Sequence, residues 1–161
     1  MNKKGNVFLD MILIPVMLVF IALNILTAVY FWNEIRDNSV IFDTTEEGAS
    51  RVKDAAQRTV DMYPYIFVMI VISMLVSLAL TGYFIESSPV FLIVGILIIA
   101  ITIVISSPLS NAYTSIIGET DLVSSSSRII ELIIINLPKL VLFLGAVFML
   151  ALYGKRSGSY A

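Results

Sequence analysis

Residues 11–33, with the sequence MILIPVMLVFIALNILTAVYFWN, decide the fold class because they contain no Asp, Glu, Lys or Arg. Further charge-free runs occupy residues 62–85, 87–118 and 140–154. A helix needs about 20 apolar residues to cross a hydrocarbon core about 30 Å thick. The first three runs reach that length, and the last reaches it only together with the residues before it. Because these runs lack the polar–apolar alternation of barrel strands, we expect an all-α integral membrane bundle of four transmembrane helices.

The composition supports a membrane protein and excludes several kinds of site. The chain is 58% hydrophobic and 14% charged, whereas soluble domains are about 45–50% apolar and about 25% charged. The sequence contains no His and no Cys, which removes the commonest general base and the usual zinc ligands. A net charge of −2 is too close to neutral to indicate a nucleic-acid partner. We therefore expect no enzymatic activity and no cofactor.

The expected organisation is a single membrane domain over residues 1–161. The four spans are predicted at residues 7–33, 63–84, 90–107 and 129–153, separated by polar segments at 34–61 and 108–127. The first polar segment carries seven acidic and four basic side chains, and an amphipathic helix that is interfacial or projects from the membrane is expected there, leading into the second span.

Local signals suggest where these helices begin and end. Thr44-x-x-Glu47 has the spacing of a capping box, and Pro64 is expected in the first turn of the second span, a position that proline tolerates. Pro108 is expected to bend or end the third span, with an amphipathic continuation to Gly118 as an alternative. The serine tract before Arg128 is expected to cap the fourth helix, which contains Pro138.

The flanking charges predict the orientation. Lys3 and Lys4 precede the first span, and Lys155 and Arg156 follow the last one. Four spans place both ends of the chain on the same side, and residues 34–61 carry a net charge of −3. The positive-inside rule therefore favours both termini on the cytoplasm-equivalent side of the membrane.

Three polar residues are expected at a similar depth: Asn24, Asn136 and Lys139. Ionisable groups inside a membrane are costly and are functional candidates. Lys139 either lies within the membrane or extends its amine to the interface, and we expect the second arrangement. Together the three residues predict either a structural hydrogen bond between the first and fourth helices or a transport site.

Small residues mark possible packing faces. Ser73, Ser77 and Thr81 recur at intervals of four along the second span, while Gly95 and Gly145 lie within the third and fourth spans. Small residues allow membrane helices to approach closely. These positions are expected to form the seam of the bundle or a contact between copies in a homo-oligomer.

The N-terminus contains a possible recognition motif. Asp10 suits the positive end of a helix dipole near the lipid headgroups, but Lys3-Lys4-Gly5 followed by this acid also resembles the leader of type IV pilin-like precursors. Those precursors are cut after the glycine, so the resemblance implies a mature chain that begins at Asn6. Pilins have a single span, and the three further spans here depart from that pattern.

The second half of the chain resembles another family. It contains Ser88-Pro89-Val90-Phe91, a long apolar run, Ser110-Asn111-Ala112-Tyr113, Asn136-Leu137-Pro138 and Leu152-Tyr153-Gly154-Lys155. Over about residues 62–156 this layout resembles small uncharacterised multi-span membrane proteins encoded by viruses of bacteria and archaea. The resemblance implies a viral protein in a virion's internal membrane or in the host cytoplasmic membrane, and it implies no catalytic residues.

Three functions are therefore carried forward. The first is a structural or assembly protein that contacts the lipid bilayer, a capsid, other membrane proteins or its own copies. The second is a holin-like permeabilising or small transport protein, favoured by the group of Asn24, Asn136 and Lys139. The third is a pilin-like or secretion-system membrane component.

Overall fold

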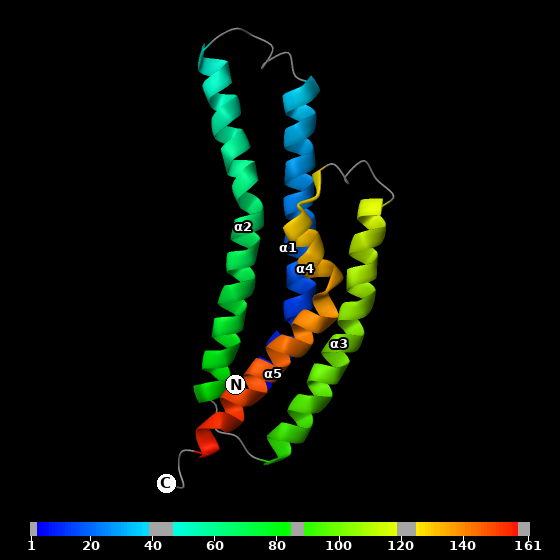
Figure 1. The fold of residues 1–161 in the computed structure, drawn as a ribbon. Coiled ribbons are helices and arrows are strands. Elements are labelled where there is room, and N and C mark those ends of the chain that lie inside the picture. The colour runs from blue at the N-terminus through cyan, green and yellow to red at the C-terminus, as the bar shows by residue number, and fades with distance from the viewer. Residues whose placement is uncertain (1–2, 39–46, 85–88, 119–124, 158–161) are drawn as a thin grey trace.

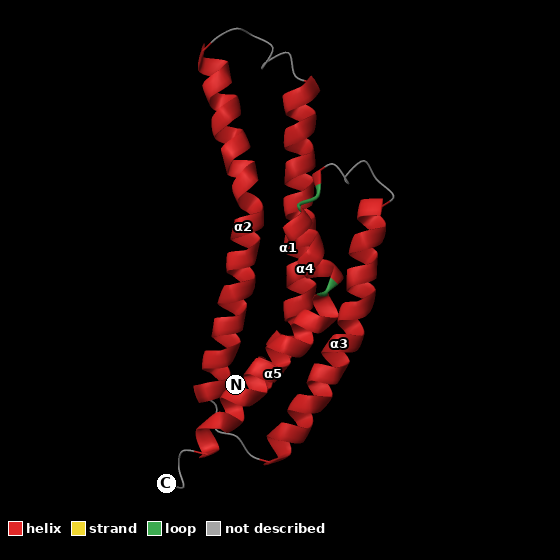
Figure 2. Cartoon of the chain, viewed as in Figure 1, coloured by secondary structure: helices red, strands yellow, loops and turns green. Residues whose placement is uncertain are grey.

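A computed structural model of the chain describes residues 3–38, 47–84, 89–118 and 125–157. These residues form five helices and no strand (Figure 2). The helices are α1 (Lys3–Asn38), α2 (Glu47–Phe84), α3 (Pro89–Gly118), α4 (Arg128–Ile135) and α5 (Leu137–Ser157). Four of them, α1, α2, α3 and α5, are long and apolar enough to cross a membrane. The predicted all-α bundle of four spans is confirmed.

The first two helices are longer than a membrane crossing requires. α1 has 36 residues and α2 has 38, which correspond to about 54 Å and about 57 Å at a rise of 1.5 Å per residue. The hydrocarbon core is only about 30 Å thick. Figure 1 shows these two helices side by side, extending past the end of α3 and past α4. A part of each helix therefore projects beyond the spanning bundle.

Two expected helix boundaries differ from the structure. The amphipathic helix expected to lead into the second span is the first part of α2, which runs without a break from Glu47 to Phe84 and contains Pro64 in its interior instead of in its first turn. α3 likewise passes through Pro108 and ends at Gly118, eleven residues after the expected end of the span at 107, as in the alternative. Membrane helices tolerate internal prolines when neighbouring helices surround them. Thr44, the first residue of the predicted capping box, lies outside the described residues.

The fourth span is divided into two helices. α4 ends at Ile135, its C-cap Asn136 has backbone angles of φ −95° and ψ 18° that leave the helical region, and α5 begins directly after Asn136. Pro138 then lies in the first turn of a helix, where its missing N–H is not needed. The break therefore replaces the kink expected within a single helix over 129–153. Ser127 is the N-cap of α4 as expected, although its side chain makes no capping hydrogen bond.

The interior contains two apolar clusters, and the outer surface is also apolar. One cluster includes Leu18, Phe67 and Ile134, and the other includes Leu78 and Phe148. Large exposed apolar side chains also cover the outside of the bundle, including Phe20, Met69, Val104 and Leu150. Soluble monomers rarely expose such extensive apolar surface, so this surface is suited to contact with lipid.

Two glycines allow close approach between helices. A Cβ atom on Gly82 would lie 2.9 Å from the backbone oxygen of Phe148, and one on Gly145 would lie 2.9 Å from three side-chain atoms of Ile99. Gly95 is also buried. The sequence pointed to Gly145 and Gly95 but not to Gly82, which is the glycine that contacts backbone.

Candidate functional site: a polar junction of α1, α2, α3 and α4

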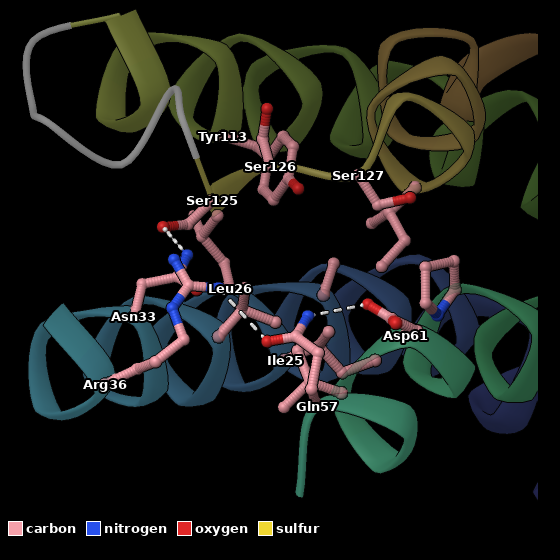
Figure 3. Close-up of a pocket in the computed structure, with 15 residues that line it drawn as sticks. Ile25, Leu26, Asn33, Arg36, Gln57, Asp61, Tyr113, Ser125, Ser126 and Ser127 are labelled. Atoms are coloured by element: carbon pink, nitrogen blue, oxygen red, sulfur yellow. Dashed lines mark hydrogen bonds between the residues drawn. The ribbon is translucent and has the colours of Figure 1, made fainter. Parts of the chain in front are cut away.

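A cavity of about 390 Å³ lies at the junction of α1, α2 and α3 with the segment that leads into α4 (Figure 3). Its walls combine apolar side chains with a group of polar ones. The lining residues are Ala22, Ile25, Leu26, Val29, Asn33, Arg36, Gln57, Val60, Asp61, Pro64, Tyr113, Ser125, Ser126, Ser127 and Ile130. The cavity lies where the charge-free runs of α1 and α2 meet their charged extensions.

Gln57 is the centre of the hydrogen bonds in this junction. Its Oε1 accepts a bond from Trp32 Nε1 at 2.9 Å and another from Arg36 Nη1 at 3.1 Å. Its Nε2 donates to Asp61 Oδ1 at 2.9 Å (Figure 3). A single amide therefore connects α1 to α2 at the base of their extensions.

Two neighbouring residues of α1, Asn33 and Arg36, make further polar contacts around the cavity. Asn33 Nδ2 donates to Ser125 Oγ at 3.2 Å, which links α1 to the segment before α4. Arg36 also donates from Nε and Nη2 to the two carboxylate oxygens of Asp37, at 2.7 Å and 3.1 Å. The guanidinium thus has a paired carboxylate outside the cavity and faces Gln57 inside it.

Tyr113 is the most deeply buried polar side chain of the cavity wall. It comes from α3, and only 1% of its surface is exposed. Its hydroxyl has no hydrogen-bond partner among the described residues, although buried polar groups in proteins are normally satisfied. In the sequence, Tyr113 stands out only as the last residue of Ser110-Asn111-Ala112-Tyr113. That motif does not predict that its side chain is buried.

The structure brings together two of the three polar residues predicted from membrane depth. Lys139 Nζ donates to Asn136 Oδ1 at 2.9 Å, and Asn136 Nδ2 donates to the backbone oxygen of Leu132 at 2.9 Å. Asn24 is not part of this group, since its Nδ2 donates to the backbone oxygen of Phe20 in its own helix at 2.7 Å. Lys139 is exposed on the bundle surface.

The small polar face of α2 does not lie between helices of this chain. Ser73 and Ser77 are exposed, and Thr81 is half-buried. Ser73 Oγ donates to the backbone oxygen of Met69, and Thr81 Oγ1 donates to that of Ser77. Of the two expected roles, a seam within the monomer does not fit Ser73 and Ser77, and a contact between copies remains a prediction.

The N-terminal motif forms part of a helix. Gly5 and Asp10 both lie in α1, and the side chain of Asp10 is exposed. Cleavage after Gly5 stays a prediction. Within the described residues, no group of three or more acidic, His or Cys side chains could hold a metal ion.

Sequence reasoning missed the residues of the polar junction, although a signal was present. Asn33 and Arg36 lie three residues apart, and Gln57 and Asp61 lie four apart, so each pair occupies one face of its helix. Both pairs also lie at the ends of charge-free runs. Their meeting depends on how α1 packs against α2, which the sequence alone does not specify.

Comparisons of the chain with protein-family models, with curated proteins and with solved structures find no match.

Proposed function

We propose that this protein is a structural or assembly component of a membrane, anchored by its four apolar helices, and that the extension of α1 and α2 contacts a protein partner. The observation that carries the proposal is the continuous helix α2. Its charged part, residues 47–61, adds about 22 Å at 1.5 Å per residue to a part that is already long enough to span. That extra length is not needed for anchoring in lipid.

The surface of this extension favours contact with another protein. Arg51, Asp54 and Arg58 are exposed, and Val52, with 60% of its surface exposed, lies among them. The apolar side of this amphipathic segment is therefore not fully buried within the chain. Mixed charges around a small apolar area resemble the rim and core of protein interfaces.

The resemblance of residues 62–156 to viral multi-span proteins supports a proposal for the class of partner. On that basis we propose a virion membrane component whose extension contacts a capsid protein or a sister subunit. The resemblance covers layout and short motifs, and it supports this part of the proposal alone.

Site-specific photo-crosslinking in native membranes tests the contact. A photoreactive residue at Val52 should capture a protein partner or a second copy of the chain. The matched control is Ile72, which has 50% of its surface exposed but lies in the apolar part of the same helix, where lipid is the expected neighbour. Equal protein capture at both positions, or none at Val52, would contradict the proposal.

The viral assignment has a separate test. Mass spectrometry of purified virions from the source should detect the chain together with capsid proteins. Its absence from virions, combined with crosslinking from Val52, would leave an assembly role in a cellular membrane and remove the viral one.

A further inference from the structure

The lining of the cavity at the polar junction changes from polar to apolar along α1. Ala22, Leu26 and Val29 line its apolar part, and Asn33 and Arg36 line its polar part. From Arg36 to Ala22 the helix descends fourteen residues, or about 21 Å, from the charged extension into the charge-free run. The cavity therefore has a polar end at the membrane boundary and an apolar end toward the membrane interior.

The polar end presents groups of both signs. Arg36 and Asp61 are the charged residues that line it. Arg36 uses Nε and Nη2 for Asp37 and one N–H of Nη1 for Gln57, which leaves two of the five guanidinium N–H groups for an anion. Asp61 accepts from Gln57 through Oδ1, and among the described residues no ion pair of this carboxylate is formed. Its second oxygen can accept from a cationic donor.

Two more groups in the walls have unused hydrogen-bonding capacity. The Tyr113 hydroxyl is buried and has no partner among the described residues. Pro64 has no N–H to donate to the backbone oxygen of Val60, the residue four before it in α2, and both residues line the cavity. A bound polar group would satisfy the hydroxyl, whose isolation otherwise carries the cost of an unsatisfied buried polar group.

We propose that this cavity binds a glycerophospholipid whose headgroup carries both a phosphate and a primary ammonium, as in phosphatidylethanolamine. The phosphate would accept from Arg36 and from the hydroxyl of Tyr113, and the ammonium would donate to Asp61. An anionic headgroup without an ammonium would place its charge close to the Asp61 carboxylate with no compensating cation of its own, and a hydroxyl in place of the ammonium could donate only a weaker, uncharged hydrogen bond. A trimethylated ammonium has no N–H to donate.

The size of the cavity sets how much of the lipid it holds. Its volume of about 390 Å³ is near the lower end of small-molecule sites, which are about 300–1,000 Å³, so it holds the headgroup and the start of one chain. Ile25 also lines a second hollow of about 270 Å³ on the α1–α2 face, with Phe20, Ile21 and Ala28. This apolar hollow continues the path for the chain.

The inference goes beyond the proposed assembly role and does not depend on it. Lipid selectivity requires only the membrane-embedded bundle and the side chains of the cavity. A negative crosslinking result at Val52 leaves it unaffected, and a negative lipid result leaves the assembly role unaffected.

Native mass spectrometry of the full chain in detergent tests the proposal by titration with three lipids of identical acyl chains. The probes are phosphatidylethanolamine, phosphatidylcholine and phosphatidylglycerol. Loss of one charge-assisted hydrogen bond weakens binding about tenfold, so phosphatidylethanolamine should bind about tenfold more tightly than either of the other two. Equal affinity for all three lipids, or a preference for phosphatidylglycerol, overturns the proposal.

Variants locate the selectivity. Asp61→Asn keeps an oxygen for Gln57 but removes the charge, and it should lower phosphatidylethanolamine affinity to the level of phosphatidylglycerol. The control is Asp54→Asn, an exposed acid of the same helix that does not line the cavity. Undiminished selectivity in Asp61→Asn overturns the proposal, because the selectivity then arises elsewhere.

A second variant covers the case in which Asp61→Asn fails to fold, as judged by thermal unfolding. Tyr113→Phe removes only the hydroxyl and should weaken phosphatidylethanolamine binding about tenfold. The control is Tyr65→Phe, because Tyr65 has 66% of its surface exposed. Equal binding by Tyr113→Phe and the unchanged chain overturns the assignment of the phosphate to this wall.

Discussion

Gly82 of α2 meets the backbone of Phe148 in α5: a Cβ atom on Gly82 would lie 2.9 Å from the Phe148 carbonyl oxygen and 3.2 Å from the Cβ atom of Ala151. The phenylalanine ring is fully buried beside this contact. A carbonyl oxygen cannot rotate away as a side chain does, so the separation of the two helices here requires glycine. Association of membrane helices depends on such close packing, because burial in lipid gives no hydrophobic gain.

Gly82→Ala should therefore destabilise the bundle. Overpacking of a tight interior contact costs about 1–3 kcal/mol, measurable as reduced resistance to unfolding in detergent or bicelles. Gly48→Ala is the matched control in the same helix, since nothing lies within 4 Å of its added methyl. A Gly82→Ala protein as stable as the Gly48→Ala protein would show that α5 moves freely at this contact.

The contact between Gly145 and Ile99 should behave differently because side-chain atoms fill it. Gly145→Ala alone should destabilise α3–α5 packing by about 1–3 kcal/mol. Ile99→Ala removes the three atoms that the methyl would meet at 2.9 Å, so the double variant should lose less stability than the two single losses summed. Unfolding measurements on the four proteins give the coupling, and strict additivity would argue against this contact.

Gln57 should control the order of the α1–α2 extension. Gln57→Leu removes the acceptor used by Trp32 and Arg36 and the donor to Asp61. A typical intramolecular hydrogen bond contributes about 0.5–1.5 kcal/mol to stability, and this variant loses three such bonds between Gln57 and its neighbours. Hydrogen exchange over residues 47–61 should accelerate about fivefold to tenfold, and emission from Trp32, the sole tryptophan, should shift.

The control for Gln57 is Thr59→Ala. Thr59 is exposed on the same helix and donates only to the backbone oxygen of Ala55 in the described hydrogen bonds. It should leave hydrogen exchange and tryptophan emission nearly unchanged. Matching effects of the two variants would mean that the extension responds to helix propensity and not to its link with α1.

The exposed polar face of α2 predicts a contact between copies. The chain contains no cysteine, so Ser77→Cys introduces a single thiol, and mild oxidation in membranes should produce a covalent dimer. Val76→Cys is the control, because Val76 is next to Ser77 in the sequence and is 48% exposed, but its side chain points to a different side of the helix. Dimer yields that are the same at both positions would indicate random collision.

Expression of the chain alone distinguishes assembly from permeabilisation. Under the proposed assembly role, the membrane potential and growth of expressing cells should stay unchanged. Rapid depolarisation that disappears in Lys139→Leu would instead support the holin-like alternative, because that substitution removes the exposed cation bonded to Asn136. Depolarisation that persists in the variant would contradict the assembly role of the protein and also the permeabilising role of Lys139.

The membrane fold was predictable because charge-free length is a property of the sequence alone. The charge-free runs at residues 11–33 and 62–85 are too long and too apolar for helices exposed to water, and this can be judged without knowing which helices lie beside them. The helix ends were harder, because proline weakens a helix locally while surrounding helices determine whether it breaks. Pro64 and Pro108 lie inside continuous helices, whereas Pro138 follows a break at Asn136.

The candidate site was largely hidden from sequence reasoning. Asn33 and Ser125 are 92 positions apart, and Tyr113 comes from a third helix, so only the packing of the bundle brings them together. Asn136 and Lys139 were grouped with Asn24 by their depth, and the bond that forms is the local one between Lys139 and Asn136, not one between the first and fourth spans. Asn24 lies at a suitable depth, but depth does not specify the direction in which a side chain leaves its helix.

Because α2 continues unbroken out of the membrane, the length of its projecting part sets a fixed distance between the lipid surface and the end of the helix. A helix is a stiff rod whose length is fixed by residue number, at 1.5 Å for each. The bond from Gln57 to Asp61 and the bonds from α1 to Gln57 brace that rod at its base. Any partner bound near Glu47 would therefore be held at a set stand-off of about 20 Å from the lipid surface, with a direction fixed by the embedded part of the same helix.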